Sequence, residues 1–318
     1  MSKLLTNVAN EIRRRDYSYR TEQAYLGWIK RFVMFNNKIH PLQIPEKKVV
    51  EFLNHLVNDK NVASSTQNQA LCAIAFLYKQ VLKKPLGILE ELTYSKKYKT
   101  LPVVLTRAEV RKIVQHLQGA AKLMVQLMYG TGLRISECQR LRVLDVDFGN
   151  ALIQVRNGKG RKDRITLLPN SLEEALSIQI KKVEHLHQKD MLNGQSNVPM
   201  PKALSVKYPN AAKQLKWQYV FPSRKIATDP RTGQQVRYHQ SGQWVNRKIA
   251  EAVLKARIQK KVSAHTFQHS FATQLLQSGY DIRTVQELLG HKDVQTTMIY
   301  THVLNKGTNY IKSPVDVL

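Results

Sequence analysis

Apolar residues recur at helical spacing from Leu4 to Lys84, and this periodicity restricts the first part of the chain to helices. A period near 3.6 residues marks the buried stripe of an amphipathic helix. Polar residues separate four such stretches, and Thr21 is a potential N-cap for the second. We therefore expect a small bundle of about four helices over residues 1–88.

The periodicity then gives way to a basic and aromatic run with prolines, which is typical of a linker. We place this linker at residues 89–104. Thr106 follows it as a threonine N-cap, and Glu109 is the N3 residue that completes a capping box. A second domain is therefore expected over residues 105–318.

Two short alternating runs in the second domain, Ala151–Val155 and Arg164–Leu168, predict β-strands. The pair Asn157-Gly158 between them favours a tight turn, so we expect a β-hairpin with Lys159 at its tip. Helical periodicity returns at 170–187, 243–257, 266–277 and 282–289. The expected fold class is mainly α with a small antiparallel β element (α+β).

Residues 191–242 interrupt the second domain with prolines, basic residues and interleaved aromatic side chains. An irregular stretch of this length within a compact domain is either disordered or functional. The alternation of Trp217, Tyr219 and Phe221 suggests one short strand with Val220 on its other face. These aromatic residues could simply anchor the insertion to the domain.

The chain carries 50 Lys and Arg against 23 Asp and Glu, a formal charge of +27, and both of its parts are cationic. Such an excess indicates an anionic partner, and nucleic acid is the first candidate. The longest uncharged apolar run, Leu71 to Tyr78, is far shorter than the ~20 residues of a membrane span. We therefore predict a DNA partner and no membrane.

The residues around the N-terminus lack the apolar core of a secretion signal, which favours a cytoplasmic protein. Cys72 and Cys138 both lie in apolar helical patterns and are expected to be buried thiols in a reducing compartment. The chain has neither a disulfide framework nor a cysteine pair spaced for a metal, so no metal site is expected.

Several short motifs hold side chains suited to phosphate chemistry, although each motif alone is weak. Arg134 and Glu137 are three residues apart in a predicted first helical turn, which is also the spacing of an ordinary solvated pair. Farther along, His291 follows a predicted helix end and Tyr300 lies nine residues later. The order and spacing of the motifs together indicate a single site for phosphate chemistry.

Together these motifs resemble those of the tyrosine site-specific recombinases, the family of phage integrases and Xer recombinases. The resemblance covers most of the chain, from the helix at 21–35 to His302. Its motifs are Thr131–Glu137, Gly158–Gly160, His265–Thr273, Leu289–His291 and Tyr300–His302. It implies an N-terminal domain that binds core DNA and a catalytic domain that cleaves and rejoins DNA.

The resemblance makes Tyr300 the nucleophile, which forms a 3′-phosphotyrosine and frees a 5′-hydroxyl. A protein nucleophile of this kind preserves the energy of the phosphodiester bond. Arg134 fits stabilisation of the charged transition state, because a guanidinium is a rigid bidentate donor. Lys159 fits the general acid that protonates the leaving oxygen. The reaction requires neither a metal nor a cofactor.

Three further positions complete the implied site. His265 fits proton transfer and phosphate contact, His291 fits a hydrogen bond in the transition state, and Glu137 fits orientation of its neighbours. Gln268 departs from the family motif His-x-x-Arg, which predicts a second arginine there. Loss of such a donor typically costs about 2.7–4 kcal/mol, so we expect impaired cleavage.

Two explanations for Gln268 remain open. A deliberate change that traps a DNA complex is the explanation we favour, because every other motif is intact. A natural enzyme of weak activity is the alternative. Both predict strong DNA binding with little covalent product.

Within the family, the long basic insertion resembles that of integron integrases. This narrower resemblance implies cassette integration and excision on folded single-stranded hairpins with extrahelical bases. Aromatic and proline faces suit stacking on unpaired bases, and the candidates are Trp217, Pro230, Tyr238 and His239. The basic residues expected to contact DNA are Lys96, Lys97, Lys99 and Arg161.

A C-terminal tail at residues 303–318 carries apolar side chains that are unlikely to stay in water. The resemblance implies that this tail docks into the next subunit of a homotetramer on DNA. Folding back onto its own domain is the alternative. For the whole chain, the rivals are a Xer-like or phage-type integrase on duplex sites and a non-catalytic DNA-binding protein.

Overall fold

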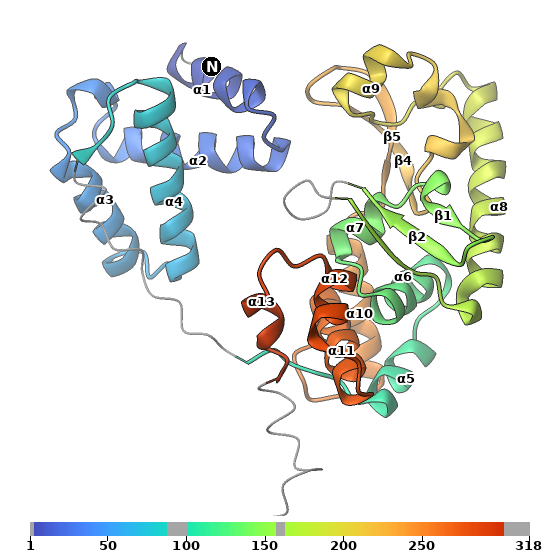
Figure 1. The fold of residues 1–318 in the computed structure, drawn as a ribbon. Helices are drawn as coiled ribbons and strands as arrows, with labels where there is room; N and C mark the ends of the chain where they lie inside the picture. The colour runs from blue at the N-terminus through green and yellow to red at the C-terminus, as the bar shows by residue number, and fades with distance from the viewer. Residues whose placement is uncertain (1–2, 88–100, 157–162, 302–318) are drawn as a thin grey trace, which may run out of the picture. The chain divides into compact units, whose positions relative to one another are not determined.

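The computed structural model describes residues 3–87, 101–156 and 163–301. The chain divides into two units, Met1–Thr100 and Leu101–Leu318, and each is described by itself. Figure 1 labels the elements of both. Within the described ranges, no helix has the length and apolar character needed to span a membrane.

The first unit is the predicted helical bundle. Its helices are α1 (Lys3–Arg14), α2 (Tyr19–Phe35), α3 (Lys47–Asn58) and α4 (Ser64–Phe76), which a π-helical segment continues over Leu77–Val81. Their apolar stripes meet in one core that includes Ile12, Ile29, Phe32, Phe52, Ile74 and Tyr78. The N-cap of α2 is Ser18 and the expectation of Thr21 was wrong: Thr21 is the N3 residue whose backbone N–H donates to Ser18 Oγ at 3.1 Å.

The second unit is also mainly helical, as expected. Its helices are α5 (Arg107–Gln115), α6 (Gly119–Thr131), α7 (Ile135–Arg140), α8 (Asn170–Leu192), α9 (Lys202–Lys207), α10 (Gly242–Lys255), α11 (Ala264–Gln277), α12 (Ile282–Leu289) and α13 (Gln295–Met298). The predicted capping box of Thr106 and Glu109 is present at the start of α5. Helix α8 extends beyond its predicted end at residue 187.

A small antiparallel sheet holds the predicted hairpin. Strands β2 (Leu152–Val155) and β3 (Arg164–Leu167) pair with Ile153 opposite Thr166, and the short β1 (Val146–Asp147) adds to the other edge of β2. The turn between β2 and β3, with Lys159 and Arg161, lies outside the described residues.

The insertion at 191–242 contains regular elements that its sequence did not reveal. Besides α9, it forms a hairpin of β4 (Pro222–Thr228) and β5 (Gln235–His239). The expected strand over Trp217–Phe221 was wrong: Trp217 ends a 3₁₀ turn, and Tyr219, Val220 and Phe221 are all buried rather than alternating between two faces.

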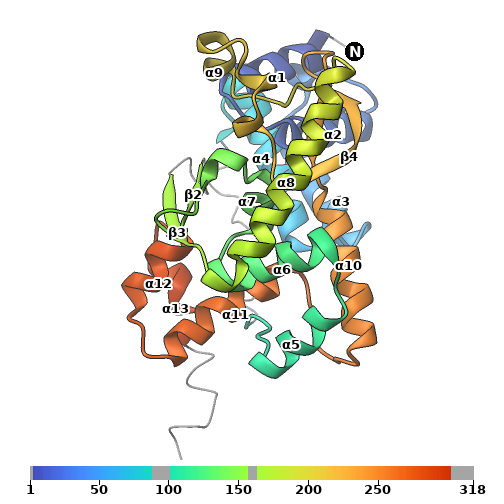
Figure 2. The same cartoon turned by 90° about the vertical axis from the view of Figure 1, so that its right-hand side faces the viewer.

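Helix α8 fastens the insertion to the rest of the second unit (Figures 1 and 2). Near its start, Leu172 and Leu176 belong to the same buried cluster as residues of α6. Near its end, Asp190 accepts hydrogen bonds of 2.5 and 2.6 Å from the guanidinium of Arg237 in β5. The buried cluster of Leu172 and Leu176 also includes Phe267 of α11, the helix that carries several candidate site residues.

Candidate active site

The turn between α6 and α7 places Arg134 and Glu137. Gly132 ends α6 with φ +69°, and a Cβ there would lie 2.6 Å from the ring of Phe271. Arg134 is the N-cap residue of α7; its backbone N–H and its Nη1 each donate to the Glu137 carboxylate at 2.8 Å. The predicted pair is therefore a partly buried ion pair that fixes the guanidinium, rather than a solvated one.

Arg164 in β3 is a second partner of Glu137 that the sequence reasoning missed. Its two Nη atoms donate to the carboxylate at 2.9 and 2.8 Å, and its Nε donates to the Leu288 carbonyl at 2.9 Å. Gly290 makes room for it, because a Cβ at this residue would lie 2.8 Å from Arg164 Cδ. Arg164 thus ties β3 to both α7 and the end of α12.

Tyr300 is buried, with only 2% of its surface exposed. It belongs to an apolar cluster with Phe271, Val285 and Leu289. Its ring stacks on that of His291, with 6.4 Å between centroids and 16° between planes. Burial raises the pKa of Tyr300 to about 12, while the charge of Arg134 acts in the opposite direction.

His269 contacts Tyr300 directly, and no role was predicted for it. Its Nδ1 lies 2.9 Å from the Tyr300 Oη. Burial lowers the pKa of His269, and its helical neighbour His265 lowers it further. His265 itself is exposed one turn earlier on α11.

His291 follows the left-handed Gly290 that ends α12. Its Nδ1 lies 2.9 Å from Thr297 Oγ1, and its carbonyl accepts from Gln286 Nε2 at 3.0 Å. These contacts hold the imidazole against the face of Tyr300.

Gln268 lies on α11 and is 4% exposed. Its Nε2 donates to the Gly132 carbonyl at 3.0 Å, in the same turn that precedes Arg134. A neutral amide therefore occupies the position where the family motif predicts a cation. Its hydrogen bond joins α11 to the turn before α7.

The structure brings together most of the predicted catalytic residues. Contacts link Arg134 to Glu137, Tyr300 to His291, and Gln268 to the turn before Arg134, and the charge of Arg134 acts on the pKa of Tyr300. The predicted residues outside the described ranges are Lys96, Lys97, Lys99, Lys159 and Arg161. The described residues contain no group of three or more His, Cys, Asp or Glu side chains arranged to hold a metal ion.

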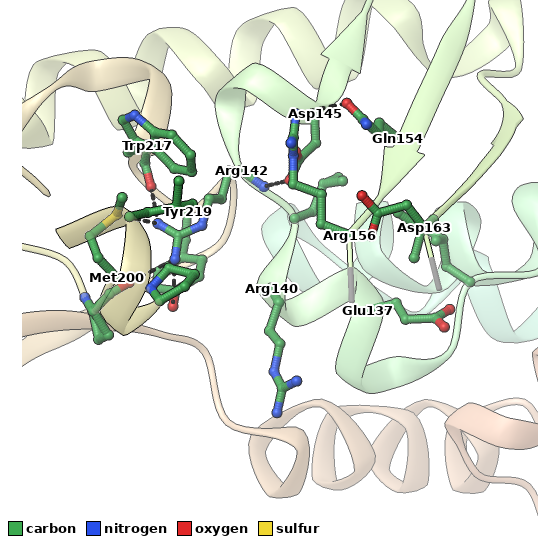
Figure 3. A pocket seen from close by; sticks show the side chains of 16 residues that line it. Glu137, Arg140, Arg142, Asp145, Gln154, Arg156, Asp163, Met200, Trp217 and Tyr219 are labelled. Carbon is green, nitrogen blue, oxygen red and sulfur yellow. Dashed lines mark hydrogen bonds and ion pairs between the residues drawn. The ribbon is translucent and has the colours of Figure 1, made fainter. Parts of the chain in front are cut away.

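The aromatic residues of the insertion gather around Arg142, which follows α7 (Figure 3). Its guanidinium carbon lies 4.6 Å from the ring centroid of Tyr219 and 5.6 Å from that of Trp217. Its Nη atoms donate to the carbonyls of Trp217 and Pro199. A buried guanidinium with carbonyl acceptors thus joins the insertion to the core of this unit.

The remaining predicted insertion residues differ in exposure. His239 packs edge-on against Tyr219, with 5.2 Å between ring centroids, and its Nδ1 lies 2.8 Å from the Gln240 carbonyl. Tyr238 donates to Asp229 at 2.8 Å. Pro230 is exposed. Trp217, Tyr238 and His239 are all partly buried and have partners, Arg142 for Trp217, Asp229 for Tyr238 and Tyr219 for His239.

A pocket of about 450 Å³ is lined both by Trp217 and by Glu137, the carboxylate that holds Arg134 (Figure 3). Its polar lining includes Glu137, Arg140, Arg142, Asp145 and Arg156, and its apolar lining includes Leu133, Val155, Met200, Pro201, Leu204 and Trp217. Pockets of this size hold small ligands or single ligand groups.

This arrangement suits nucleophilic attack on a phosphodiester. A phenol supplies the nucleophile, a fixed guanidinium can bind non-bridging phosphate oxygens, and imidazoles can donate or accept protons. The neutral Gln268 stands at the position where the resemblance predicts a second arginine.

Comparison with known proteins agrees with this chemistry. The sequence pattern described as "Phage integrase family" matches residues 103–306, and "Phage integrase, N-terminal SAM-like domain" matches residues 4–88. An "Integrase/recombinase" of Escherichia coli is 46% identical over 316 residues, which cover 99% of this chain and 94% of that protein. A "Tyrosine recombinase" of Pseudothermotoga lettingae is 29% identical over 315 residues, covering 96% of each.

Solved structures share the fold at lower identity. A lambda integrase dimer bound to a COC′ core site has a TM-score of 0.62 at 14% identity, with 99% of both chains covered. XerH recombinase bound to its difH substrate has a TM-score of 0.56 at 20% identity, covering 94% of this chain and 82% of that one. From the two sequence patterns and the 46% identical relative, the chain belongs to the phage integrase family of tyrosine recombinases.

Proposed function

We propose that the chain cleaves and rejoins DNA at specific sites through a 3′-phosphotyrosyl bond to Tyr300. The observation that carries this proposal is the setting of Tyr300, a buried phenol stacked on His291 and subject to the charge of Arg134. Family membership supports DNA breaking and rejoining as the type of reaction.

The roles follow from the geometry and the family motif. Arg134, held by Glu137, binds the non-bridging oxygens of the scissile phosphate. His265 contacts the phosphate and fits proton transfer, and His291 makes a hydrogen bond in the transition state. Lys159 protonates the leaving 5′-oxygen. No metal or cofactor enters these steps.

The two units have different proposed functions, DNA binding and catalysis. Residues 1–88 form the DNA-binding domain, 89–104 the basic linker, and 105–318 the catalytic domain. Both parts are cationic, which suits a clamp that encircles a duplex. Such a protein acts in the cytoplasm, where its DNA is.

We expect the reaction to be slow in this chain because of Gln268. Its amide donates to the Gly132 carbonyl and adds no positive charge to a dianionic transition state. The missing arginine corresponds to about 2.7–4 kcal/mol, or roughly a hundred- to a thousandfold in rate. This expectation holds whether Gln268 is a deliberate change or natural.

Nicked suicide substrates test both the cleavage by Tyr300 and its slowing by Gln268. Loss of a short strand after cleavage traps the covalent complex. Gln268→Arg should raise the initial rate of covalent complex formation by roughly a hundred- to a thousandfold, and adding Tyr300→Phe should abolish it. Absence of product from Gln268→Arg would favour the non-catalytic DNA-binding protein. Abundant product from the unaltered chain, with no gain from Gln268→Arg, would contradict the role given to residue 268.

For the substrate, we propose folded single-stranded hairpins with extrahelical bases, as in cassette integration and excision by integron integrases. The supporting observation is the pocket of about 450 Å³ that Trp217 and Glu137 both line. An indole face in the lining of a pocket suits stacking on an unpaired base, worth about 1–3 kcal/mol. Pro230, Tyr238 and His239 are candidates for further base contacts in the same insertion.

Measured affinities for a bulged hairpin and for a perfect duplex with the same stem distinguish a hairpin substrate from a duplex substrate. Trp217→Ala and His239→Ala should each weaken hairpin binding roughly five- to a hundredfold more than duplex binding. Tyr208→Ala is the matched control, because Tyr208 is an exposed aromatic residue of the insertion that does not line the pocket. Equal losses on both substrates would contradict the stacking role.

A Xer-like or phage-type integrase on duplex sites is the second candidate. Its support is the similarity to XerH, whose structure is bound to difH, and to lambda integrase on its core site. Preference of the unaltered chain for duplex over the matching hairpin would favour this candidate.

The tail at 303–318 lies outside the described residues. We propose that it docks into the next subunit of a homotetramer on DNA, as the family resemblance implies. Truncation after Lys306 should then leave DNA binding intact and reduce the size of the complex on paired sites. An unchanged size would indicate that the tail folds back onto its own domain.

A further inference from the structure

We propose that His269 is a catalytic residue whose Nδ1 takes the phenolic proton of Tyr300 as the tyrosine attacks DNA. The inference rests on the proposed function, in which Tyr300 is the nucleophile. It differs from the sequence-based assignment of proton transfer to His265, because His269 is the histidine that contacts the phenolic oxygen.

The geometry places the acceptor against the reacting atom. The distance of 2.9 Å between His269 Nδ1 and Tyr300 Oη is that of a good hydrogen bond. The two rings are tilted by 50° with centroids 5.6 Å apart, so the contact is edge to edge rather than a face stack. Since Tyr300 is only 2% exposed, bulk water has little access to its proton.

The protonation states fit this role at neutral pH. Burial and His265 lower the pKa of His269 from its ordinary 6.5, so the imidazole is neutral. A phenol with a pKa raised to about 12 keeps its proton and donates. Nδ1 is therefore the acceptor, which requires the tautomer with its proton on Nε2.

The groups facing this pair come from several elements. His265 lies on the same helix, Arg134 precedes α7, and His291 after α12 stacks on the phenol ring. Helices α6 and α10 pack against α11, and their buried cluster with Phe267 is apolar, with Met128 and Ile249 as members. Arg134 is thus the fixed positive charge that acts on the phenol.

The phenolic oxygen forms a bond to phosphorus while the bond from phosphorus to the 5′-oxygen breaks. The phenolic proton moves to His269 Nδ1, and the 5′-oxygen receives a proton from Lys159. In the reverse reaction the imidazolium returns its proton to the phenol. Because a phenol of pKa about 12 is not ionised beforehand at neutral pH, the transfer accompanies attack.

His269→Asn separates proton transfer from positioning, because an asparagine oxygen can accept the phenolic hydrogen bond but is not a base. We would measure covalent complex formation in the full chain with Gln268→Arg, on a substrate with a 5′-bridging phosphorothiolate. Its thiolate leaves without a proton, so the rate reports on the nucleophile.

The rate with His269 should fall as the pH drops through the lowered pKa of His269, below the ordinary 6.5, because the imidazole then becomes protonated. His269→Asn should lower the neutral-pH rate by about 10²–10⁴-fold and remove this fall. His185→Asn, on an exposed part of α8, should change neither. A rate and pH profile unchanged by His269→Asn, or loss of the fall in His265→Asn instead, would overturn the proposal.

A measurement on the free protein gives a second readout that needs no DNA. Imidazole ¹⁵N resonances of the full chain should show His269 as the neutral Nε2–H tautomer. Tyr300→Phe removes the donor to Nδ1 and should raise the pKa of His269; an unchanged pKa would contradict the proposal. Covalent product that survives Tyr300→Phe would instead overturn the proposed function, so the two failures are distinguishable.

Discussion

At the scale of single residues, the guanidinium of Arg134, which we propose to be catalytic, is fixed by one largely buried carboxylate. Glu137 is bound by Arg134 and Arg164, and all three side chains are largely buried. Burial acts to raise the pKa of Glu137, but the hydrogen bonds and charges of the two guanidinium groups hold it below 4.5. The carboxylate is therefore charged in the folded protein throughout the neutral range.

Glu137→Ala should destabilise the second unit by about 3–5 kcal/mol, because it leaves two guanidinium groups without their carboxylate. Calorimetry of the full chain measures this as a lower unfolding temperature. The contribution should be complete above pH 4.5 and should disappear as the pH falls through the lowered pKa of Glu137.

The matched control is Glu251→Ala, which removes a carboxylate from an exposed pair with Lys248. It should leave the unfolding temperature unchanged. Equal shifts of the unfolding temperature in the two variants would show that the ion pairs of Glu137 stabilise the fold no more than an exposed surface pair does.

Most of the candidate site could be predicted from motif order, but two of its members could not. His269 follows Gln268 directly in the sequence. Its contact with the Tyr300 hydroxyl depends on which face of α11 packs against Tyr300. Arg164 begins a strand and reaches Glu137 because β3 packs beside α7 and α12. Both contacts join residues far apart in the sequence, and no local pattern specifies such contacts.

At the scale of elements, periodicity predicted the long helices and the hairpin of β2 and β3. It missed β4 and β5, because prolines and charged residues obscure any pattern in the insertion. The insertion is positioned by distant contacts, from Asp190 to Arg237 and from Arg142 to Trp217. Such a segment is specified by tertiary partners more than by its own sequence.

Arg142→Met should loosen the insertion, because it leaves the partly buried carbonyls of Pro199 and Trp217 without their donor. Hydrogen exchange should become faster over residues 199–219 and stay the same over 3–87. Arg140→Met is the control, since Arg140 is exposed and its side chain points away from the Arg142 cluster (Figure 3). Unchanged exchange in Arg142→Met would contradict the anchoring role.

At the scale of the whole molecule, the charge of +27 predicts that DNA affinity is strongly salt-dependent. If the clamp neutralises about 6–10 phosphates, affinity should fall by about 10³–10⁵-fold between 50 and 200 mM salt. Fluorescence anisotropy with labelled DNA measures this slope. A fall of less than tenfold would show that most of the charge lies away from the DNA.

The proposed reaction depends on a covalent bond between Tyr300 and DNA. Mass spectrometry of protease-digested covalent complex from the Gln268→Arg chain identifies the modified residue directly. We predict a nucleotide joined through its 3′-phosphate to the peptide that contains Tyr300. A nucleotide on any other residue, or attachment through a 5′-phosphate, would contradict this account.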